Sequence, residues 1–493
     1  MSVQQELRGI CKLRGVQLFA LTGLLVGVGT ECFLTKLSVL DLDVWWHLSV
    51  GDWILRHHAF PHSGILSRTA ANHPWMAYSW VYEVLLASFY DSFGFVGMAL
   101  LGTAVTMAVA IVVFCMLHRI SGRFWRSWIL TITACSAFLF NIMPRPVFFS
   151  MALFALTLML IFEAQNSGRL RPLYWLALIF IVWANSHIQF VYGLFAVGLL
   201  AGVSLLQHAA LNLGIYPGSL RKPELPAAPL LGIVVCCAAA TCLGPYSYHL
   251  YGLLPEYSSS KIFYTMIQEM QALSFQGVSH FLELLLACAA FFAIGWRQKL
   301  DPYRLLLLVT ASVLAFRMTR DAWLLCITAV AVIADSPAPE NNRDRSVSLS
   351  EWTGVGIAAV FLLFLAARNT DFNQRGLDRA ISSRFPVDAV NFIRKHPVPG
   401  PLYNNFDWGG FLIFYLPEYP VSVDGRGDLY GDDFCEKLYA TESAEPSYVQ
   451  DPYLNEAGLV ILKNTVPLSR LLPTDQRFRV IYHDEVATVL ARN

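Results

Sequence analysis

The feature that most constrains this chain is a series of long apolar runs, each bounded by charged residues or by proline. A bilayer core about 30 Å thick is crossed by roughly 20 residues of helix, so runs of this length are predicted to span a membrane. Backbone groups find no hydrogen-bond partner in lipid, which favours helices. Eleven candidate spans follow: 16 to 39, 94 to 117, 125 to 143, 146 to 163, 172 to 190, 191 to 208, 227 to 245, 278 to 296, 303 to 317, 320 to 335 and 352 to 368.

Composition supports the same interpretation. Of the 493 residues, 56% are hydrophobic and 14% are charged, whereas soluble domains carry about 25% charged residues to face water. Much of the surface is therefore predicted to face lipid. Lysine plus arginine and aspartate plus glutamate each total 35, so the overall charge indicates no nucleic-acid partner.

Basic residues give the predicted orientation, because Lys and Arg in short loops are biased to the cytoplasmic side. Alternate loops are basic, and they contain Arg8, Lys12 and Arg14; Arg119, Arg123 and Arg126; Arg169 and Arg171; Arg221 and Lys222; Arg297, Lys299 and Arg304; and Arg343 and Arg345. The first run is long and no A-x-A-like cleavage site follows it, so it is interpreted as an uncleaved span. The N-terminus is thus predicted to be cytoplasmic, in an inner membrane, with the C-terminal tail outside.

Two domains are predicted. Residues 1 to 368 form a transmembrane domain, whose first extracytoplasmic loop covers 40 to 93, and residues 369 to 493 form a small extracytoplasmic α/β domain. In the tail, PVDAVNFIRKH reads as a helix over 386 to 396. The predicted strands lie at 401 to 404, 410 to 416, 420 to 424, 459 to 463 and 478 to 490.

Asp41 and Asp43 open the first outer loop, and His47 follows them. One interpretation is that an aspartate caps an interfacial helix that begins near Val44. The other is that paired carboxylates at a membrane face act as a general base or bind a divalent cation. The loop tryptophans are more simply interfacial anchors, and no HExxH-like spacing indicates a histidine metal site.

Three arginines lie at the ends of predicted spans on the same outer side: Arg145, Arg317 and Arg320. A guanidinium matches phosphate oxygens with a fork of donors, so these residues are candidate phosphate ligands. The alternative is a snorkelling side chain or an ion pair, since Asp321 is adjacent. Residues 185 to 189, which include His187, could bind a polar ligand or satisfy the backbone where two spans meet.

The tail contains a second acidic motif, DGRGDLYGDD, which begins at Asp424. It fails the EF-hand template, because Leu429 replaces the glycine at the sixth position and Cys435 replaces the glutamate at the twelfth. A strand followed by a glycine-rich turn is the simpler interpretation. The alternative is that Asp424, Arg426 and Asp428 face a ligand.

The loop opening with Asp-x-Asp, the span count and the outer tail together resemble the GT-C superfamily of membrane glycosyltransferases. More narrowly, DLDVWWHLSVGDWIL, HPWMAYSWVYEVLL, NNFDWGG and VSVDGRGDLYG resemble a branch of bacterial membrane proteins assigned to that superfamily. The resemblance covers most of the chain. Asp-x-Asp alone is common by chance, while its combination with the topology and the tail motifs is more specific.

The resemblance implies an enzyme that moves a sugar, with inversion, from a polyprenyl-phosphate donor to a glycan, lipid or protein acceptor outside the membrane. Asp43 or Asp41 would then be the base, or Asp43 a ligand for Mg²⁺ or Mn²⁺. Arg317 or Arg320 would hold the phosphate, with His47 and Arg145 as further substrate ligands. Members often use a second acidic or histidine residue in a later outer loop, for which Glu256, Glu269 and His187 are the candidates.

Two other functions share the spans and the outer polar residues. A transporter or flippase for lipid-linked sugars would show internal repeats and broken helices near the midplane, and neither is clear in the sequence. A non-catalytic envelope assembly protein would use the membrane part as a scaffold, and its first outer loop would tolerate substitution.

Overall fold

The computed structural model describes residues 3–138, 144–255, 267–335 and 343–493. The chain divides into two compact units. Unit 1 comprises Met1–Thr35, Gly102–Ser247 and Glu269–Thr370, and unit 2 comprises Lys36–Leu101, Tyr248–Gln268 and Asp371–Asn493. Each unit is therefore assembled from three separate stretches of the sequence.

Unit 1 is built from helices. They are α1 (Val3–Thr35), the later part of α4 (Trp80–Ser121), α5 (Phe124–Phe138), α6 (Val147–Ser167), η2 (Arg171–Trp175), α7 (Leu176–Ser186), α8 (Phe190–Asn212), α9 (Ala227–Thr241), α12 (Val278–Gly295), α13 (Pro302–Arg317), η5 (Thr319–Asp321), α14 (Ala322–Ala334) and α15 (Leu349–Arg368). The short turn η4 (Gln268–Met270) lies at the unit boundary.

Each of the eleven apolar runs predicted from the sequence overlaps at least one of these helices. Residues 139–143, the end of the third run, lie outside the described residues. Gly94 has a φ of 61° and interrupts α4, so the predicted span at 94 to 117 matches the helical segment after that kink. Within the described ranges, six helices are long and apolar enough to cross a membrane: α1, α4, α6, α8, α12 and α15. The count of eleven spans stays a prediction.

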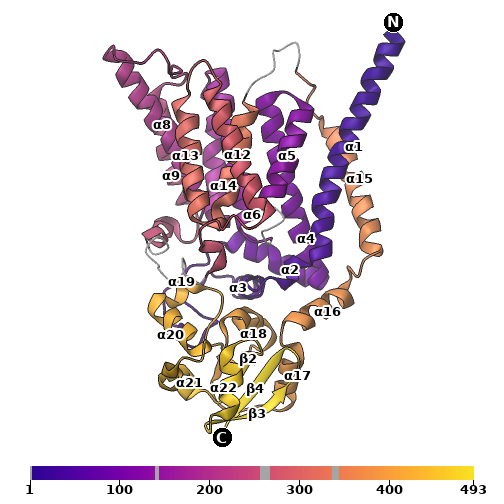
Figure 1. Ribbon diagram of the computed structural model, residues 1–493, viewed down its shortest axis with the longest axis vertical. Coiled ribbons are helices and arrows are strands. Elements are labelled where there is room, and N and C mark those ends of the chain that lie inside the picture. The colour runs from indigo at the N-terminus through magenta and orange to yellow at the C-terminus, as the bar shows by residue number, and fades with distance from the viewer. Residues whose placement is uncertain (1–2, 139–143, 256–266, 336–342) are drawn as a thin grey trace. The chain divides into compact units, whose positions relative to one another are not determined.

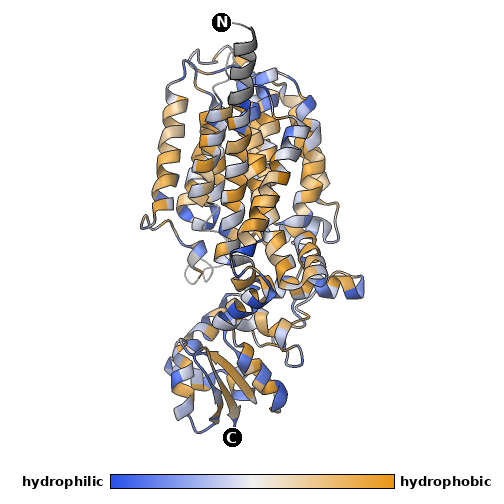
Figure 2. Cartoon of the chain, turned by 90° about the vertical axis from the view of Figure 1, so that its right-hand side faces the viewer, coloured by the Kyte–Doolittle hydropathy of each residue, from blue (hydrophilic) through white to orange (hydrophobic). Residues whose placement is uncertain are grey.

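The centre of unit 1 is α14, whose sequence AWLLCITAVAVIA is apolar all round. A helix with no polar face is stable only when neighbours surround it, and all its residues except Ile333 are buried. It packs against α5, α6, α12 and α13, which run beside it (Figure 1). Hydrophobic residues dominate the middle of the unit 1 helices, and hydrophilic residues collect near their ends (Figure 2).

The basic loops meet one another at one end of unit 1. Arg14 forms an ion pair with Glu351 at 2.6 Å, which joins the N-terminal helix to the start of α15. Arg297 lies 2.8 Å from Asp335, which joins the loop between α12 and α13 to the end of α14. This pairing agrees with the predicted alternation of the loops, while the membrane side that this end faces stays a prediction.

Unit 2 combines residues 36–101, which include the predicted first outer loop, with residues 248–268 and the tail. Its elements are α2 (Leu37–Leu40), α3 (Val44–His57), the first part of α4, η3 (Ser247–Gly252), α16 (Gln374–Arg384), α17 (Val387–Lys395), β1 (Leu402–Asn404), η7 (Phe406–Trp408), α18 (Gly409–Tyr415), α19 (Gly427–Tyr430), α20 (Asp432–Glu442), η8 (Pro446–Gln450), α21 (Pro452–Glu456), β2 (Leu459–Lys463), α22 (Pro467–Leu471), η9 (Leu472–Thr474), β3 (Phe478–His483) and β4 (Ala487–Arg492).

A four-stranded mixed sheet, in the order β1-β2-β4-β3, forms the core of the tail. Strand β1 is parallel to β2, with Leu402 opposite Leu459, and the other pairs are antiparallel. The predicted strand at 478 to 490 is a hairpin, because Asp484 accepts hydrogen bonds from the Val486 and Ala487 N–H groups and turns the chain between β3 and β4.

Two predicted tail strands are wrong. Residues 410 to 416 lie mostly in the helix α18, which packs against α3. A short apolar run has no periodicity that separates a buried strand from a buried helix, and here the contact with α3 decides. Residues 420 to 424 form no strand and contribute only a bridge between Ser67 and Val421.

The predicted helix over 386 to 396 corresponds to α17, and the predicted strands at 401 to 404 and 459 to 463 correspond to β1 and β2. Residues 36–101 pack with residues 371–493. The division into domains 1 to 368 and 369 to 493 stays a prediction.

Candidate functional site

Asp41 and Asp43 lie at the start of α3, in unit 2. The helix begins at Val44, as the sequence predicts, and Asp43 occupies its N-cap position. Its carboxylate nevertheless makes no capping hydrogen bond. Asp41 Oδ1 instead accepts a hydrogen bond of 3.1 Å from the Asp43 N–H. The two carboxylates therefore have different local roles: Asp41 is buried and shapes the turn, and neighbours distant in sequence surround the Asp43 side chain.

Glycines of the two tail motifs lie against this turn. A Cβ atom added at Gly425 would overlap Asp43 Oδ1 and would lie 3.2 Å from Trp46 Nε1. A Cβ atom at Gly410 would lie 3.1 Å from the Leu42 carbonyl oxygen and 3.2 Å from the Trp46 amide nitrogen. The motifs NNFDWGG and VSVDGRGDLYG thus converge on the opening of the first loop, which the sequence alone did not indicate.

A buried ion pair fixes the second tail motif. Arg426 donates to both Asp424 oxygens at 2.8 and 2.7 Å, and the Tyr430 hydroxyl donates to Asp424 Oδ2 at 2.8 Å. The Arg426 guanidinium also lies 4.7 Å from the centre of the Trp75 ring, a cation–π distance. Burial alone would raise the pKa of Asp424, but the attached Arg426 holds that pKa below its usual value. This pair is part of the fold.

His47, a predicted substrate ligand, lies one turn further along α3. Its Nδ1 is 3.1 Å from Glu83 Oε1 on α4, and both side chains are buried. The Trp46 ring lies 3.5 Å from the His47 ring, centre to centre. The imidazole is thus held between α3 and α4, and its contact with substrate stays a prediction.

A second cluster of predicted residues lies in unit 1. Arg145 Nη1 donates to Glu269 Oε1 at 3.2 Å and lies 3.4 Å from Oε2. Arg320 Nη1 lies 3.8 Å from the same Oε1. The side chains of Arg145, Glu269 and Arg320 are 21%, 42% and 27% exposed, so solvent reaches this group. Two guanidiniums therefore flank one accessible carboxylate, and we call these three residues the arginine cluster.

Backbone hydrogen bonds place Glu269 beside the end of α13. The Thr319 N–H donates to the Gln271 carbonyl at 2.9 Å, and the Leu273 N–H donates to the Phe316 carbonyl at 3.2 Å. Arg145 arrives from the segment before α6. The cluster joins three segments that are far apart in the sequence, so no local sequence motif indicates it.

Polar residues hydrogen-bond to Asp321, which directly follows Arg320 of the cluster. Asp321 accepts hydrogen bonds from Gln189 Nε2 at 3.1 Å and from the Tyr192 hydroxyl at 2.5 Å. It is therefore bound to α8 and its preceding turn, rather than serving only as an ion-pair partner for Arg320. Gln189 belongs to the polar segment that the sequence singled out, whereas the role of Tyr192 was missed, because a single tyrosine at the start of an apolar run carries no signal.

His187 is also held within unit 1. Its Nδ1 is 2.8 Å from the Ser150 hydroxyl, to which Trp183 Nε1 donates at 2.7 Å. His187 is 2% exposed. Arg317 ends α13 and is exposed. Glu256 lies outside the described residues.

The structure thus brings Arg145, Glu269 and Arg320 together in unit 1, and it brings Asp41, Asp43 and His47 together in unit 2. The prediction that Asp43, Arg317 and Arg320 serve one site stays a prediction. Across residues 3–138, 144–255, 267–335 and 343–493, no three His, Cys, Asp or Glu side chains gather as a metal site. Binding of Mg²⁺ or Mn²⁺ at Asp43 stays a prediction.

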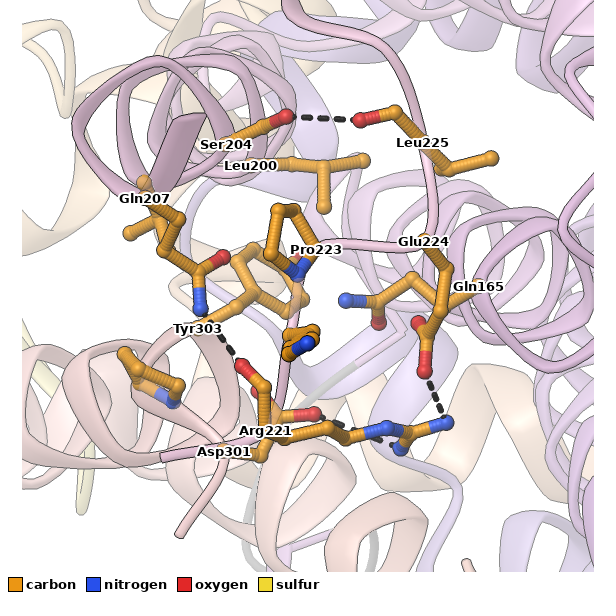
Figure 3. A pocket seen from close by; sticks show the side chains of 13 residues that line it. Gln165, Leu200, Ser204, Gln207, Arg221, Pro223, Glu224, Leu225, Asp301 and Tyr303 are labelled. Carbon is orange, nitrogen blue, oxygen red and sulfur yellow. Dashed lines mark hydrogen bonds and ion pairs between the residues drawn. The ribbon is translucent and has the colours of Figure 1, made fainter. Parts of the chain in front are cut away.

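A small pocket lies at the other end of unit 1, among the basic loops (Figure 3). Arg221 closes it through ion pairs with Glu224 and Asp301, and Gln165 and Tyr303 line it. Its volume of about 20 Å³ is enough for about one water molecule. No residue predicted to bind substrate lines this pocket.

Comparison with known proteins gives no family model and no curated protein that matches the chain. Solved structures do match. The chain is similar to the archaeal oligosaccharyltransferase AglB from Archaeoglobus fulgidus, solved with an inhibitory peptide and dolichol-phosphate, with a TM-score of 0.51 and 10% identity over 90% of this chain and 69% of that chain.

It is also similar to ArnT from Cupriavidus metallidurans, solved with undecaprenyl phosphate, with a TM-score of 0.49 and 13% identity over 95% of this chain and 97% of that chain. At 10% identity the AglB match shows a shared fold and nothing further. The fold expected from the resemblance found in the sequence agrees with this match. The chain is a polytopic, multi-pass α-helical membrane protein.

Proposed function

We propose that this protein is a membrane glycosyltransferase that takes a sugar from a polyprenyl-phosphate carrier and transfers it, with inversion, to an acceptor outside the cytoplasmic membrane. The observation that carries the proposal is the arginine cluster. Two guanidiniums around one solvent-reached carboxylate form a cationic site that a phosphate can enter, because guanidinium donors match carboxylate and phosphate oxygens alike. The shared fold with AglB supports the same activity.

In the proposed reaction, the Asp43 carboxylate accepts the proton of the acceptor hydroxyl. The hydroxyl oxygen then forms a bond to the anomeric carbon of the sugar from the face opposite the phosphate. The bond between that carbon and the phosphate oxygen breaks, and its electron pair leaves with the carrier phosphate. A single displacement of this kind inverts the anomeric centre.

Each group has a physical reason for its role. Asp43 makes no capping bond at α3, so helix formation does not require its carboxylate, and a positioned base typically contributes about 10²–10⁴-fold to the rate. Arg145 and Arg320 would stabilise the charge that develops on the leaving phosphate. Asp41 would orient the turn through its bond to the Asp43 N–H. No step is assigned to a metal.

The test uses purified protein in detergent or nanodiscs, polyprenyl-phosphate sugars and candidate acceptors. Asp43→Asn should lower kcat by about 10²-fold or more, while Asp41→Asn should have a smaller effect. Asp52→Asn is the matched control, because Asp52 lies on the same helix and forms only an exposed ion pair with Arg56. Full activity in the Asp43 variant would exclude Asp43 as the base.

The same experiment separates the alternatives. A transferase releases carrier phosphate and forms a glycosylated acceptor. A transporter or flippase would move the intact lipid-linked sugar across reconstituted vesicles without releasing carrier phosphate. An assembly scaffold would do neither, and its first outer loop would accept substitution without consequence.

A further inference from the structure

The orientation of the Asp43 carboxylate is set by tertiary neighbours. A side chain at a helix N-cap is commonly held by the free N–H groups of the first turn, but Asp43 makes no such bond. Gly425 of the tail lies directly against Asp43 Oδ1, and a Cβ atom at this position would force that carboxylate to move. The tail therefore forms one wall of the space that the carboxylate occupies.

That wall is held firmly within unit 2. Asn404 Oδ1 accepts from the Ser422 N–H at 2.9 Å, and Asn404 Nδ2 donates to the Val423 carbonyl at 2.8 Å. These bonds tie the motif NNFDWGG to VSVDGRGDLYG, and both Asn404 and Ser422 are buried. Asp424 and Arg426, which precede and follow Gly425, form an ion pair and are fully buried. Because the segment around Gly425 is fixed on both sides, a side chain added at Gly425 would displace Asp43 rather than the segment itself.

The first loop is bonded to the same segment. The Thr69 hydroxyl donates to the Ser422 carbonyl at 2.6 Å, and the Arg68 N–H donates to the Val421 carbonyl at 2.8 Å. Residues 68 and 69 of the first loop are thus hydrogen-bonded to the tail motif, and Gly425 of the same motif contacts Asp43 directly.

We propose that the two tail motifs position the Asp43 carboxylate for proton transfer, with Gly425 as the residue that sets its place. This inference rests on the function proposed above. It assigns the tail a part in the reaction through Asp43, so that Gly425 and Gly410 are positioning residues. A catalytic group displaced by about 1 Å can cost about 10²-fold in rate, which makes the role measurable.

The experiment is a graded glycine series. Gly425→Ala places a methyl group on Asp43 Oδ1, and Gly410→Ala asks Leu42 and Trp46 to move by only a few tenths of an ångström. Gly252→Ala is the matched control in the same unit, since no atom of the described residues lies within 4 Å of an added Cβ there. We expect kcat to fall about 10–100-fold in Gly425→Ala and about threefold in Gly410→Ala, with KM for the lipid donor changed less than about threefold.

Two readouts separate positioning from folding. The acidic limb of the kcat–pH profile should shift in Gly425→Ala, because a moved base has a new environment, whereas simple loss of folded protein lowers kcat without moving that limb. Hydrogen exchange should rise in peptides around residues 41–50 and stay unchanged in β2 and β4. If Gly425→Ala does not fold, the milder Gly410→Ala still tests the proposal.

The outcomes distinguish the two proposals. Active wild-type protein, with both variants matching Gly252→Ala in kcat and pH profile, would overturn the positioning role and leave the transferase intact. A rise in KM for the lipid donor at unchanged kcat would likewise overturn it, because the tail would then act in binding. If the wild type turned over no polyprenyl-phosphate sugar with any acceptor, the proposed function would fail and the positioning role with it.

Discussion

Two groups of charged residues in unit 1 look alike in composition and differ in environment. At the end with the basic loops, Arg304 is fully buried, pairs with Asp301, lies 2.8 Å from Asp335 and stacks 4.6 Å from the Phe162 ring centre. In the arginine cluster, solvent reaches every member and the distances are 3.2 to 3.8 Å. The first group is sealed from solvent, whereas solvent reaches the arginine cluster, where we propose that a substrate phosphate binds.

The largest expected effect tests the sealed side of this comparison. Arg304→Ala should lower the free energy of unfolding by about 3 kcal/mol. It removes the fully buried cation between Asp301 and Asp335 and leaves each carboxylate with a partly exposed arginine, Arg221 or Arg297. The measurement is thermal unfolding of the purified protein. Arg119→Ala is the control, since its pair with Glu163 is largely exposed and contributes less than about 1 kcal/mol. Equal stability of the two variants would remove the distinction between the groups.

The open side should respond in activity and not in stability. Arg145→Ala and Arg320→Ala should each lower kcat by about 10²-fold through lost stabilisation of the leaving phosphate. Their midpoints of thermal unfolding should stay close to that of Arg119→Ala, because neither arginine is sealed in the core. A large loss of stability with unchanged turnover of the surviving protein would make the arginine cluster structural.

A pair of aspartates extends the comparison to unit 2. Arg426 holds the pKa of Asp424 low, while burial raises the pKa of Asp428 to about 6. Since an unfolded aspartate titrates near pH 4, the neutral form of Asp428 favours folding below that pH, and this contribution is lost as the pH rises through 6.

Asp428→Asn should therefore stabilise the protein by about 3 kcal/mol at pH 8 and have little effect near pH 4. Chemical unfolding at both pH values measures this difference, and Asp433→Asn, an exposed aspartate of α20, is the control. A stabilisation that did not depend on pH would exclude burial of the charge as its cause.

The smallest expected effect concerns the competition between the Glu269 carboxylate and a donor phosphate for the two arginines. Glu269→Gln keeps the shape of the side chain but weakens its attraction to Arg145 and Arg320. A donor phosphate would then compete with a weaker partner for the two guanidiniums. KM for the lipid donor should fall about threefold, in line with the 0.2–1 kcal/mol of an exposed ion pair. Glu163→Gln is the control. A fall in kcat of tenfold or more would instead assign Glu269 a contact with the reacting groups.

The sequence predicted the membrane part well, for a physical reason. Helices such as α6 and α12 need only a long apolar run, because lipid forces each backbone to satisfy its own hydrogen bonds. The tail was harder to predict. The run FLIFYL was interpreted as a strand and is mostly the helix α18, and GGFLIFY owes that form to its packing against α3.

The candidate site likewise has parts that the local sequence predicted and parts that only tertiary packing decided. The sequence by itself determined the start of α3 at Val44, the positions of Asp41 and Asp43 before it, and the arginines at helix ends, since these follow from local polarity and periodicity. Only the tertiary structure decided that Glu269 lies between Arg145 and Arg320, and that Gly425 lies against Asp43. Each of these contacts joins residues more than fifty positions apart in the sequence, and the packing that brings them together is a property of a whole unit that no local pattern encodes.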